Sequence, residues 1–251
     1  LMMSGFVNAH SHAPMTLLRG YGENLPLDRW LNEKIFPFED KLTDNAIAAS
    51  TTLACAEMIR FGTVSFSDMY FFSQTMAKSI LDSGMKCNLS RGLTVFSDQD
   101  YEQLEAYKDN VDLLKNYQNA GNGRLKIDLC IHGEYTTTPK VVEALAKHAK
   151  SENVNVHIHL SETKKEHEEC KQRHGKTPAK YFADLGLFDQ PTTAAHCVWV
   201  EDEDIELLKK YGVTVACNPV SNIKLASGFA PIPKMLEKGV NIALGTDGCA
   251  S

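Results

Sequence analysis

Two histidines spaced two apart, His10 and His12, end an apolar, strand-like run that begins at Gly5. Because successive side chains of a strand point to opposite faces, these two imidazoles point the same way. Two neutral imidazoles on one face can chelate a cation of the Zn²⁺ type, which nitrogen ligands suit. Polar residues also end strands at ordinary loops, so the pair predicts a metal site only if other ligands end other strands.

Residues of the same kinds end several later strands. The strands predicted over Leu125–His132, Asn153–Leu160, Thr192–His196 and Val240–Asp247 contribute His132, His159, His196 and Asp247 at their ends. A lone strand histidine is more often a core residue than a ligand, and an aspartate in Gly-Thr-Asp-Gly is often only a turn former. Their recurrence at the carboxyl ends of several strands favours a shared metal site, because those ends meet at one face of a barrel.

Strands and helices alternate along the chain, and this pattern predicts the fold. The remaining predicted strands are Gly5–His12, Thr63–Asp68, Lys86–Leu93 and Val213–Cys217, and the predicted helices are Thr43–Phe61, Ser73–Ser83, Asp100–Asn119, Pro139–Lys150, Glu162–His174, Pro178–Leu185, Asp202–Tyr211 and Ile232–Lys238. Eight strands without a linker or low-complexity segment favour an α/β fold, a (β/α)8 TIM-like barrel, over an open doubly wound sheet. We interpret residues 1–251 as a single barrel domain that lacks the eighth helix, and therefore as a piece of a longer protein.

Composition limits the classes of partner. The 251 residues carry a net charge of -6 and 43% hydrophobic side chains, enough for a sizeable core without a basic stripe. Nucleic acid and anionic membranes are therefore not expected as partners. No apolar run approaches the roughly 20 residues of a membrane span, and no secretion signal is apparent. With seven cysteines and no C-x-x-C pair, the sequence predicts a soluble, cytoplasmic protein with reduced thiols. Its oligomeric state is left open, a homo-oligomer included.

Six motifs along the chain carry a family resemblance. They are Phe6–His12, His132–Tyr135, His157–Thr163, Ala195–Cys197, Asn218–Asn222 and Leu244–Gly248. Together they resemble the amidohydrolase superfamily, and within it the 5-methylthioadenosine/S-adenosylhomocysteine deaminases, next to the chlorohydrolases of triazines. The resemblance implies a metal-dependent aminohydrolase that converts 5'-methylthioadenosine, S-adenosylhomocysteine or adenosine into the inosine analogue plus ammonia. In such relatives an eighth helix and a small β-sandwich domain complete the barrel, and neither is present here.

The resemblance also implies a role for each site residue. One divalent cation, most often Zn²⁺ with Fe²⁺ or Mn²⁺ as alternatives, is expected on His10, His12, His159 and Asp247. The family spacing His-x-x-Glu selects His159 over His157, which is expected to face inward one layer down. Glu162 matches the proton shuttle, His196 the residue that holds the attacking water or the developing charge, and His132 the histidine that contacts the purine ring. Asp247 is also expected to take a proton from the water.

The chemistry of these groups supports the same roles. Three histidines and a carboxylate leave an open position for water, whose pKa a cation lowers toward roughly 7. A carboxylate beside that position, such as Glu162, can serve as both acid and base. Its alternative is a solvated side chain at the start of a charged helix. The fourth strand ends in His132 and not in a lysine that could bridge two metals, which favours one metal and a deaminase or dechlorinase reaction.

Three further residues match substrate contacts of the nucleoside deaminases. Trp30 and Glu39 match positions that pack on the ligand and bind ribose hydroxyls, and Arg91 matches an arginine that meets the carboxylate of S-adenosylhomocysteine. Each has a structural alternative: a loop anchor, a solvated charge and an ion pair, respectively. A second carboxylate-binding arginine has no match after Arg91, and Gly133-Glu134 replaces the more usual Ala-Pro. Both departures weaken the expectation of a homocysteine substrate.

Two other functions stay open at this point. One is hydrolysis of another heteroaromatic ring, such as guanine or a triazine, which would not require the ribose-type Glu39. The other is a non-catalytic metal-binding barrel, against which the presence of Glu162 and His196 beside the ligands argues. Release of ammonia from nucleosides or from free bases would separate the three.

Overall fold

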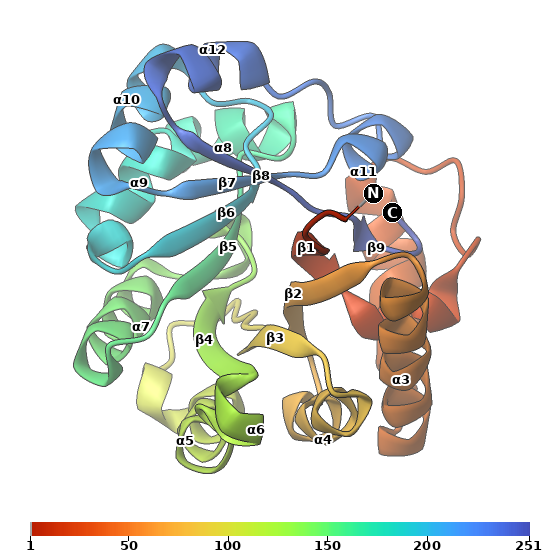
Figure 1. Cartoon of the computed structure of the whole chain (residues 1–251). Coiled ribbons are helices and arrows are strands. Elements are labelled where there is room, and N and C mark those ends of the chain that lie inside the picture. The colour runs from red at the N-terminus through yellow and green to blue at the C-terminus, as the bar shows by residue number, and fades with distance from the viewer. Residues whose placement is uncertain (1) are drawn as a thin grey trace.

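Parallel strands surround the centre of the molecule and helices pack outside them (Figure 1). The computed structural model describes residues 2–251. The strands are β1 (Phe6–His12), β2 (Thr63–Tyr70), β3 (Lys86–Arg91), β4 (Leu125–Ile131), β5 (Val156–Leu160), β6 (Thr192–His196), β7 (Thr214–Cys217), β8 (Asn241–Leu244) and β9 (Asp247–Gly248). Their order is β8-β7-β6-β5-β4-β3-β2-β1-β9, and each neighbouring pair described is parallel. The predicted (β/α)8 barrel class is confirmed.

The eighth strand differs from the continuous run Val240–Asp247 that the sequence predicts. It is divided into β8, which pairs with β7, and β9, which pairs with β1 and so closes the barrel. The division arises because the backbone N–H of Thr246 bonds to the side chain of Asn8 (3.0 Å), whose amide bonds in turn to Oγ1 of Thr246 (2.7 Å). A Cβ at Gly245 would collide with the side chain of Asn218, so this close approach requires glycine.

Most helices lie where the sequence predicts them. The long ones are α3 (Asp44–Arg60), α4 (Ser73–Ser83), α5 (Glu105–Tyr117), α7 (Pro139–Glu152), α8 (Lys164–His174) and α10 (Asp202–Tyr211), and the shorter ones are α6 (Ala120–Gly123), α9 (Pro178–Asp184), α11 (Pro219–Lys224) and α12 (Ile232–Lys238). The helix predicted over Asp100–Asn119 is interrupted, because Leu104 is extended (φ -69°, ψ 145°) and separates a short 3-10 turn from α5. The one predicted from Glu162 begins two positions later, because the hydroxyl of Thr163 caps it by accepting from the N–H of Glu166.

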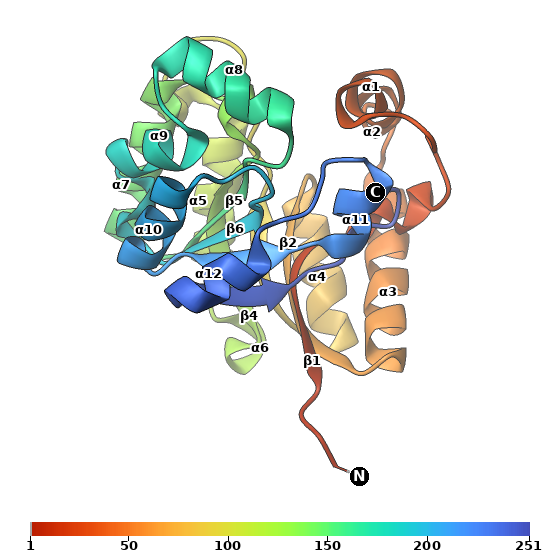
Figure 2. The same ribbon diagram turned by 90° about the horizontal axis from the view of Figure 1, so that it is seen from above.

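The long segment between β1 and α3 covers one end of the barrel. It contains α1 (Leu27–Trp30), a π-helical turn over Leu31–Ile35 and α2 (Phe36–Glu39). Figure 2 shows α1, α2 and α8 at the opposite end of the molecule from the N-terminus. The barrel therefore presents the carboxyl ends of its strands to this helical segment, and the site lies between them.

One flank of the barrel is apolar and open to solvent. Phe6 and Val7 of β1, Val64 of β2 and Leu244 of β8 are each more than half exposed. Within residues 2–251 no helix follows β9. Among the same residues, no helix has both the length and the apolar character needed to cross a membrane.

Candidate metal centre and active site

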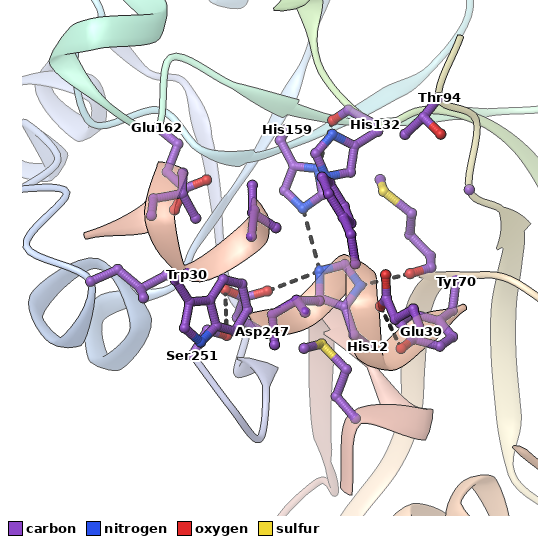
Figure 3. A pocket seen from close by; sticks show the side chains of 18 of the residues that line it. His12, Trp30, Glu39, Tyr70, Thr94, His132, His159, Glu162, Asp247 and Ser251 are labelled. Carbon is purple, nitrogen blue, oxygen red and sulfur yellow. Dashed lines mark hydrogen bonds and ion pairs between the residues drawn. The ribbon is translucent and has the colours of Figure 1, made fainter. Parts of the chain in front are cut away.

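Four side chains from three strands meet at the carboxyl end of the barrel. His10 and His12 come from β1, His159 from β5 and Asp247 from β9, and one ligand atom of each lies within 4.8 Å of the others. Oδ1 of Asp247 is 3.2 Å from Nε2 of His10 and 3.0 Å from Nε2 of His12. The two Nε2 atoms of His12 and His159 are 3.4 Å apart. Figure 3 shows His12, His159 and Asp247 turned toward one another. Three nitrogens and a carboxylate oxygen form a donor set that fits one divalent cation of the Zn²⁺ type.

The other ring nitrogens of these histidines are held by hydrogen bonds. Nδ1 of His12 lies 2.6 Å from the carbonyl oxygen of Met69, and Nδ1 of His159 lies 2.6 Å from the carbonyl oxygen of His132. A carbonyl can only accept, so each Nδ1 carries the proton and donates it. Each Nε2 points toward the other ligand atoms and would offer its lone pair to a bound cation, which is how proteins commonly orient metal-binding histidines.

His157 lies inside the barrel, as its inward-facing position in β5 predicts. It is buried, and its Nε2 is 2.9 Å from Nδ1 of His10. Burial holds the pKa of His157 well below its usual value, so the ring is neutral. His157 therefore hydrogen-bonds to His10 from the inner layer of the barrel and is not itself a member of the cluster.

The charges in the cluster suit a cation. Burial lowers the pKa of His10 to about 4 and holds that of His159 well below its usual value, so both rings are neutral. Burial would raise the pKa of Asp247, but its hydrogen bonds with His10 and His12 hold it well below its usual value. Although burial also lowers the pKa of His12, the hydrogen bond and charge of Asp247 raise it to about 9. A cation binding here would therefore displace a proton from His12.

Glu162 and His196 form a second pair beside the cluster. Both are buried, and Oε2 of Glu162 lies 3.7 Å from Nε2 of His196. Burial raises the pKa of Glu162. Burial lowers the pKa of His196, but the charges of Glu162 and Asp247 outweigh this and raise it. Nδ1 of His196 is 2.8 Å from the side-chain oxygen of Asn222, which fixes the ring orientation. The two groups are close enough to interact by charge, and both are shielded from bulk water.

Glu166 lies within the charged helix that the sequence predicts over Glu162–His174, and it is buried in the structure. Its carboxylate accepts hydrogen bonds from the backbone N–H groups of Ser161 and Glu162, each at 2.8 Å. Burial, followed by the charge of Glu162, raises its pKa to about 7. The spacing Thr163-x-x-Glu166 is that of a capping box, and this signal could have identified Glu166 as a residue that folds back onto the loop.

A cavity of about 70 Å³ adjoins the cluster and receives most of the predicted substrate contacts (Figure 3). Trp30, Glu39 and His132 line it, together with His12, His159, Glu162, His196 and Asp247. Glu39 accepts a hydrogen bond from the hydroxyl of Tyr70 at 2.6 Å, and burial raises its pKa. Burial also lowers the pKa of His132 to about 4, so its ring is neutral. The structure thus brings these three side chains to one cavity, while their roles toward a substrate stay predictions.

Arg91 does not lie among the residues that line this cavity. Its Nε donates to Oδ2 of Asp109 at 2.9 Å, and its guanidinium lies 5.3 Å from the ring centre of Phe71, which does line the cavity. Arg19 is also paired elsewhere, with Glu57 at 2.7 Å on the surface. The ion-pair alternative for Arg91 is therefore what the structure shows, and its contact with a substrate stays a prediction.

A larger cavity of about 510 Å³ adjoins the cavity at the cluster. We call the larger one the outer cavity and the one at the cluster the inner cavity. The two share lining residues, namely Leu27, Leu31, Phe36, Tyr135 and Leu225. Basic side chains also line the outer cavity, and these are Lys164, Lys165 and Arg173. The sequence reading missed this cavity, because its walls come from α1, the π-helical turn, α8 and the segment after α11, which meet only in the fold.

Glu134, which stands where the resemblance expects proline, is a buried anion. Nη2 of Arg173 lies 2.6 Å from its Oε2 and Nε2 of His174 lies 2.9 Å from its Oε1, while the Glu134 side chain is only 1% exposed. Arg173→Met would leave this carboxylate short of one partner. We expect the free energy of unfolding to fall by about 1 to 3 kcal/mol, measured by urea denaturation.

The control for that variant is Arg29→Met, which removes an arginine from an exposed pair with Glu33. Exposed pairs contribute little to stability, because water and salt screen them, so this control should unfold near the wild-type urea concentration. If the free energy of unfolding fell equally in Arg173→Met and Arg29→Met, burial of the Glu134 carboxylate would add nothing to the effect of losing its arginine.

The chain is similar to known proteins along its whole length. The model of the amidohydrolase family matches residues 1–251. The chain is 47% identical over 251 residues to the 5-methylthioadenosine/S-adenosylhomocysteine deaminase of Dictyoglomus thermophilum and 43% identical over 251 residues to the 5'-deoxyadenosine deaminase of Methanosarcina mazei, covering 100% of this chain and 58% of each relative. Among solved structures, a zinc-bound adenosine deaminase from Xanthomonas campestris superposes with a TM-score of 0.92 at 34% identity, over 99% of this chain and 57% of that one. The chain thus spans 58% of the length of these two curated relatives.

Proposed function

The chain belongs to the amidohydrolase family, and from this premise we propose that its barrel deaminates an adenosine-type nucleoside by hydrolysis, releasing ammonia. The observation that carries the proposal is the joint placement of the cluster around Asp247, the Glu162–His196 pair and a cavity lined by Trp30 and Glu39. The names of the similar proteins, which are deaminases of 5-methylthioadenosine, S-adenosylhomocysteine, 5'-deoxyadenosine and adenosine, support the same substrate class.

We propose Zn²⁺ as the cation, held by His10, His12, His159 and Asp247. The donor set suits zinc, and the similar adenosine deaminase contains it. When bound, the cation would lower the pKa of the attacking water and stabilise negative charge on the reacting ring.

The residues around the cluster supply the proton transfers. In this proposal Asp247, a member of the cluster, takes a proton from the attacking water as the new carbon–oxygen bond forms. Glu162, whose pKa is raised by burial, can give a proton to the neighbouring ring nitrogen. His196 lies beside it and can hold the developing charge. The carbon–nitrogen bond then breaks once the departing amine has gained a proton. The carboxyl group of Asp247 or Glu162, when protonated, can deliver that proton.

The cavity residues favour a nucleoside over a free base. One oxygen of Glu39 accepts from Tyr70, and its carboxylate has further capacity to accept hydrogen bonds from ribose hydroxyls. Trp30 offers an aromatic face and His132 a neutral ring for the purine. A free ring such as guanine or a triazine has no ribose hydroxyls for Glu39 to bind.

The test is release of ammonia from a panel of substrates by the zinc-loaded protein, with the panel containing adenosine, 5'-methylthioadenosine, guanine and a chlorotriazine. We expect turnover of the nucleosides and little or none of the free ring compounds. Faster turnover of guanine or the triazine would replace the proposal by the other ring-hydrolase function. Absence of ammonia from every compound, with metal bound, would favour a non-catalytic barrel.

The 5' substituent provides a further prediction. A homocysteine carboxylate needs a cation, and a bidentate arginine is the strong way to supply it. Arg91 is already paired with Asp109 and stacked on Phe71, so we expect kcat/KM for 5'-methylthioadenosine or adenosine to equal or exceed that for S-adenosylhomocysteine. Steady-state kinetics on the three substrates measure this. A preference for S-adenosylhomocysteine of about tenfold or more, which corresponds to about 1.4 kcal/mol, would contradict it and assign the carboxylate to a cation such as Arg91 or Lys164.

A further inference from the structure

The segment that follows β7 contacts three separate side chains of the site. Its first part, Asn218–Asn222, is one of the motifs that carry the family resemblance, and its last residue orients His196. Three hydrogen bonds connect the segment to the site, from Oγ of Ser221 to Oδ2 of Asp247 (2.6 Å), between Asn222 Oδ1 and His196 Nδ1 (2.8 Å), and from Oγ of Ser227 to Oε1 of Glu162 (3.2 Å). The last of these reaches the proposed proton shuttle itself.

Ser227 is held in place from several sides. It is buried, its backbone N–H donates to the carbonyl of Asn222 (2.8 Å), and its own carbonyl accepts from the indole N–H of Trp199 (2.7 Å). The next residue, Gly228, has φ +124°, and an added Cβ would lie 3.0 Å from a methyl carbon of Val198. A non-glycine residue would therefore be strained there. The backbone of Ser227 is thus held by contacts that do not involve Glu162.

The backbone of Glu162 is fixed independently, by the hydrogen bonds that Glu166 accepts from Ser161 and Glu162. The backbone contacts leave the side-chain torsions of Glu162 open, and the terminal one has a broad, roughly two-fold preference in glutamate. The hydroxyl of Ser227 donates to Oε1, and Oε2 is the oxygen that lies 3.7 Å from Nε2 of His196.

We propose that Ser227 is a positioning residue for Glu162. Its hydroxyl holds Oε1 of Glu162, so that Oε2 faces His196 and the cavity. The inference rests on the proposed function, since Glu162 matters to turnover only if it moves the proton. A group held in its reacting orientation avoids an ordering cost in the transition state, and small misplacements can cost about 100-fold in rate. Ser227 is expected to contribute through Glu162 alone and not through contact with the substrate.

The experiment compares Ser227→Ala with Ser79→Ala in the zinc-loaded protein, assayed with 5'-methylthioadenosine. Ser79 is also buried, but it lies on α4 and bonds to backbone carbonyls. We expect Ser227→Ala to lower kcat by roughly 10- to 100-fold with KM within about twofold. Metal content and unfolding temperature should stay near wild type, and Ser79→Ala should behave as wild type. A kcat within about twofold of wild type in Ser227→Ala would overturn the proposal.

Two further measurements separate positioning from general structure. In a Glu162→Gln background, Ser227→Ala should lower kcat little further, because its effect passes through the missing carboxylate. Full, independent losses in the double variant would overturn the inference. A crystal structure of Ser227→Ala should show the Glu162 carboxyl rotated or in two orientations, whereas an unchanged orientation would refute the role even if nucleosides prove not to be the substrates. Lack of turnover by the wild-type protein would instead count against the proposed function.

Discussion

Replacing Glu162 with glutamine is expected to lower kcat by roughly 10² to 10⁴, the usual loss when a general acid-base group is removed. The amide keeps the size of the side chain and can still accept from Ser227, but it cannot carry a proton between water, ring and amine. Because none of the four metal-cluster atoms belongs to Glu162, bound zinc should stay near its wild-type amount. Steady-state ammonia release together with metal analysis of the same sample measures both quantities.

The matched control is Glu168→Gln, on the exposed face of α8. It makes the same chemical change six residues further along the chain, outside the site, and we expect normal turnover. Near-normal kcat in the Glu162 variant would remove this residue from the mechanism. A parallel loss of zinc and turnover would mean instead that the substitution disturbs the metal centre.

The parts of the site that were predictable from sequence are those that depend on local pattern alone. Alternation along β1 and β5 places His10 and His12 on one face and sends His157 and His159 inward at successive layers. In a barrel of parallel strands, carboxyl ends share one face, so residues far apart in the chain, such as His159 and Asp247, could be expected to meet. The structure brings these ligand atoms within 4.8 Å of one another.

The features that were missed depend on contacts between distant segments. The eighth strand divides because Thr246 bonds to Asn8, and its apolar sequence reads as continuous. Glu166 has the composition of a solvated helix residue, yet it folds back onto the loop before the helix. The long side chain of Arg91 points toward Asp109. Asp109 lies on α5, and the sequence pattern does not predict where this helix lies relative to Arg91.

The metal centre gives the prediction with the widest consequence. If His10, His12, His159 and Asp247 bind one ion, the carefully prepared protein should hold about one equivalent of zinc. His159→Ala removes one of three nitrogen donors, and we expect it to lose most of the metal and essentially all turnover. His157→Ala removes only a hydrogen-bond partner of His10, so metal affinity should fall by the roughly 10- to 100-fold typical of such partners.

Comparing the His157 and His159 variants is informative because the two residues lie two positions apart in β5. Both are buried, with 2% exposure for His157 and 6% for His159. General damage to the barrel would affect both variants alike, whereas ligation predicts a much larger loss for His159→Ala. His148→Ala, on α7 and bonded to Tyr101, should leave zinc binding unchanged. Two tightly bound equivalents in the wild-type protein would contradict a single-ion site, and equal metal loss in the His157 and His159 variants would contradict the assignment of His159 as a ligand.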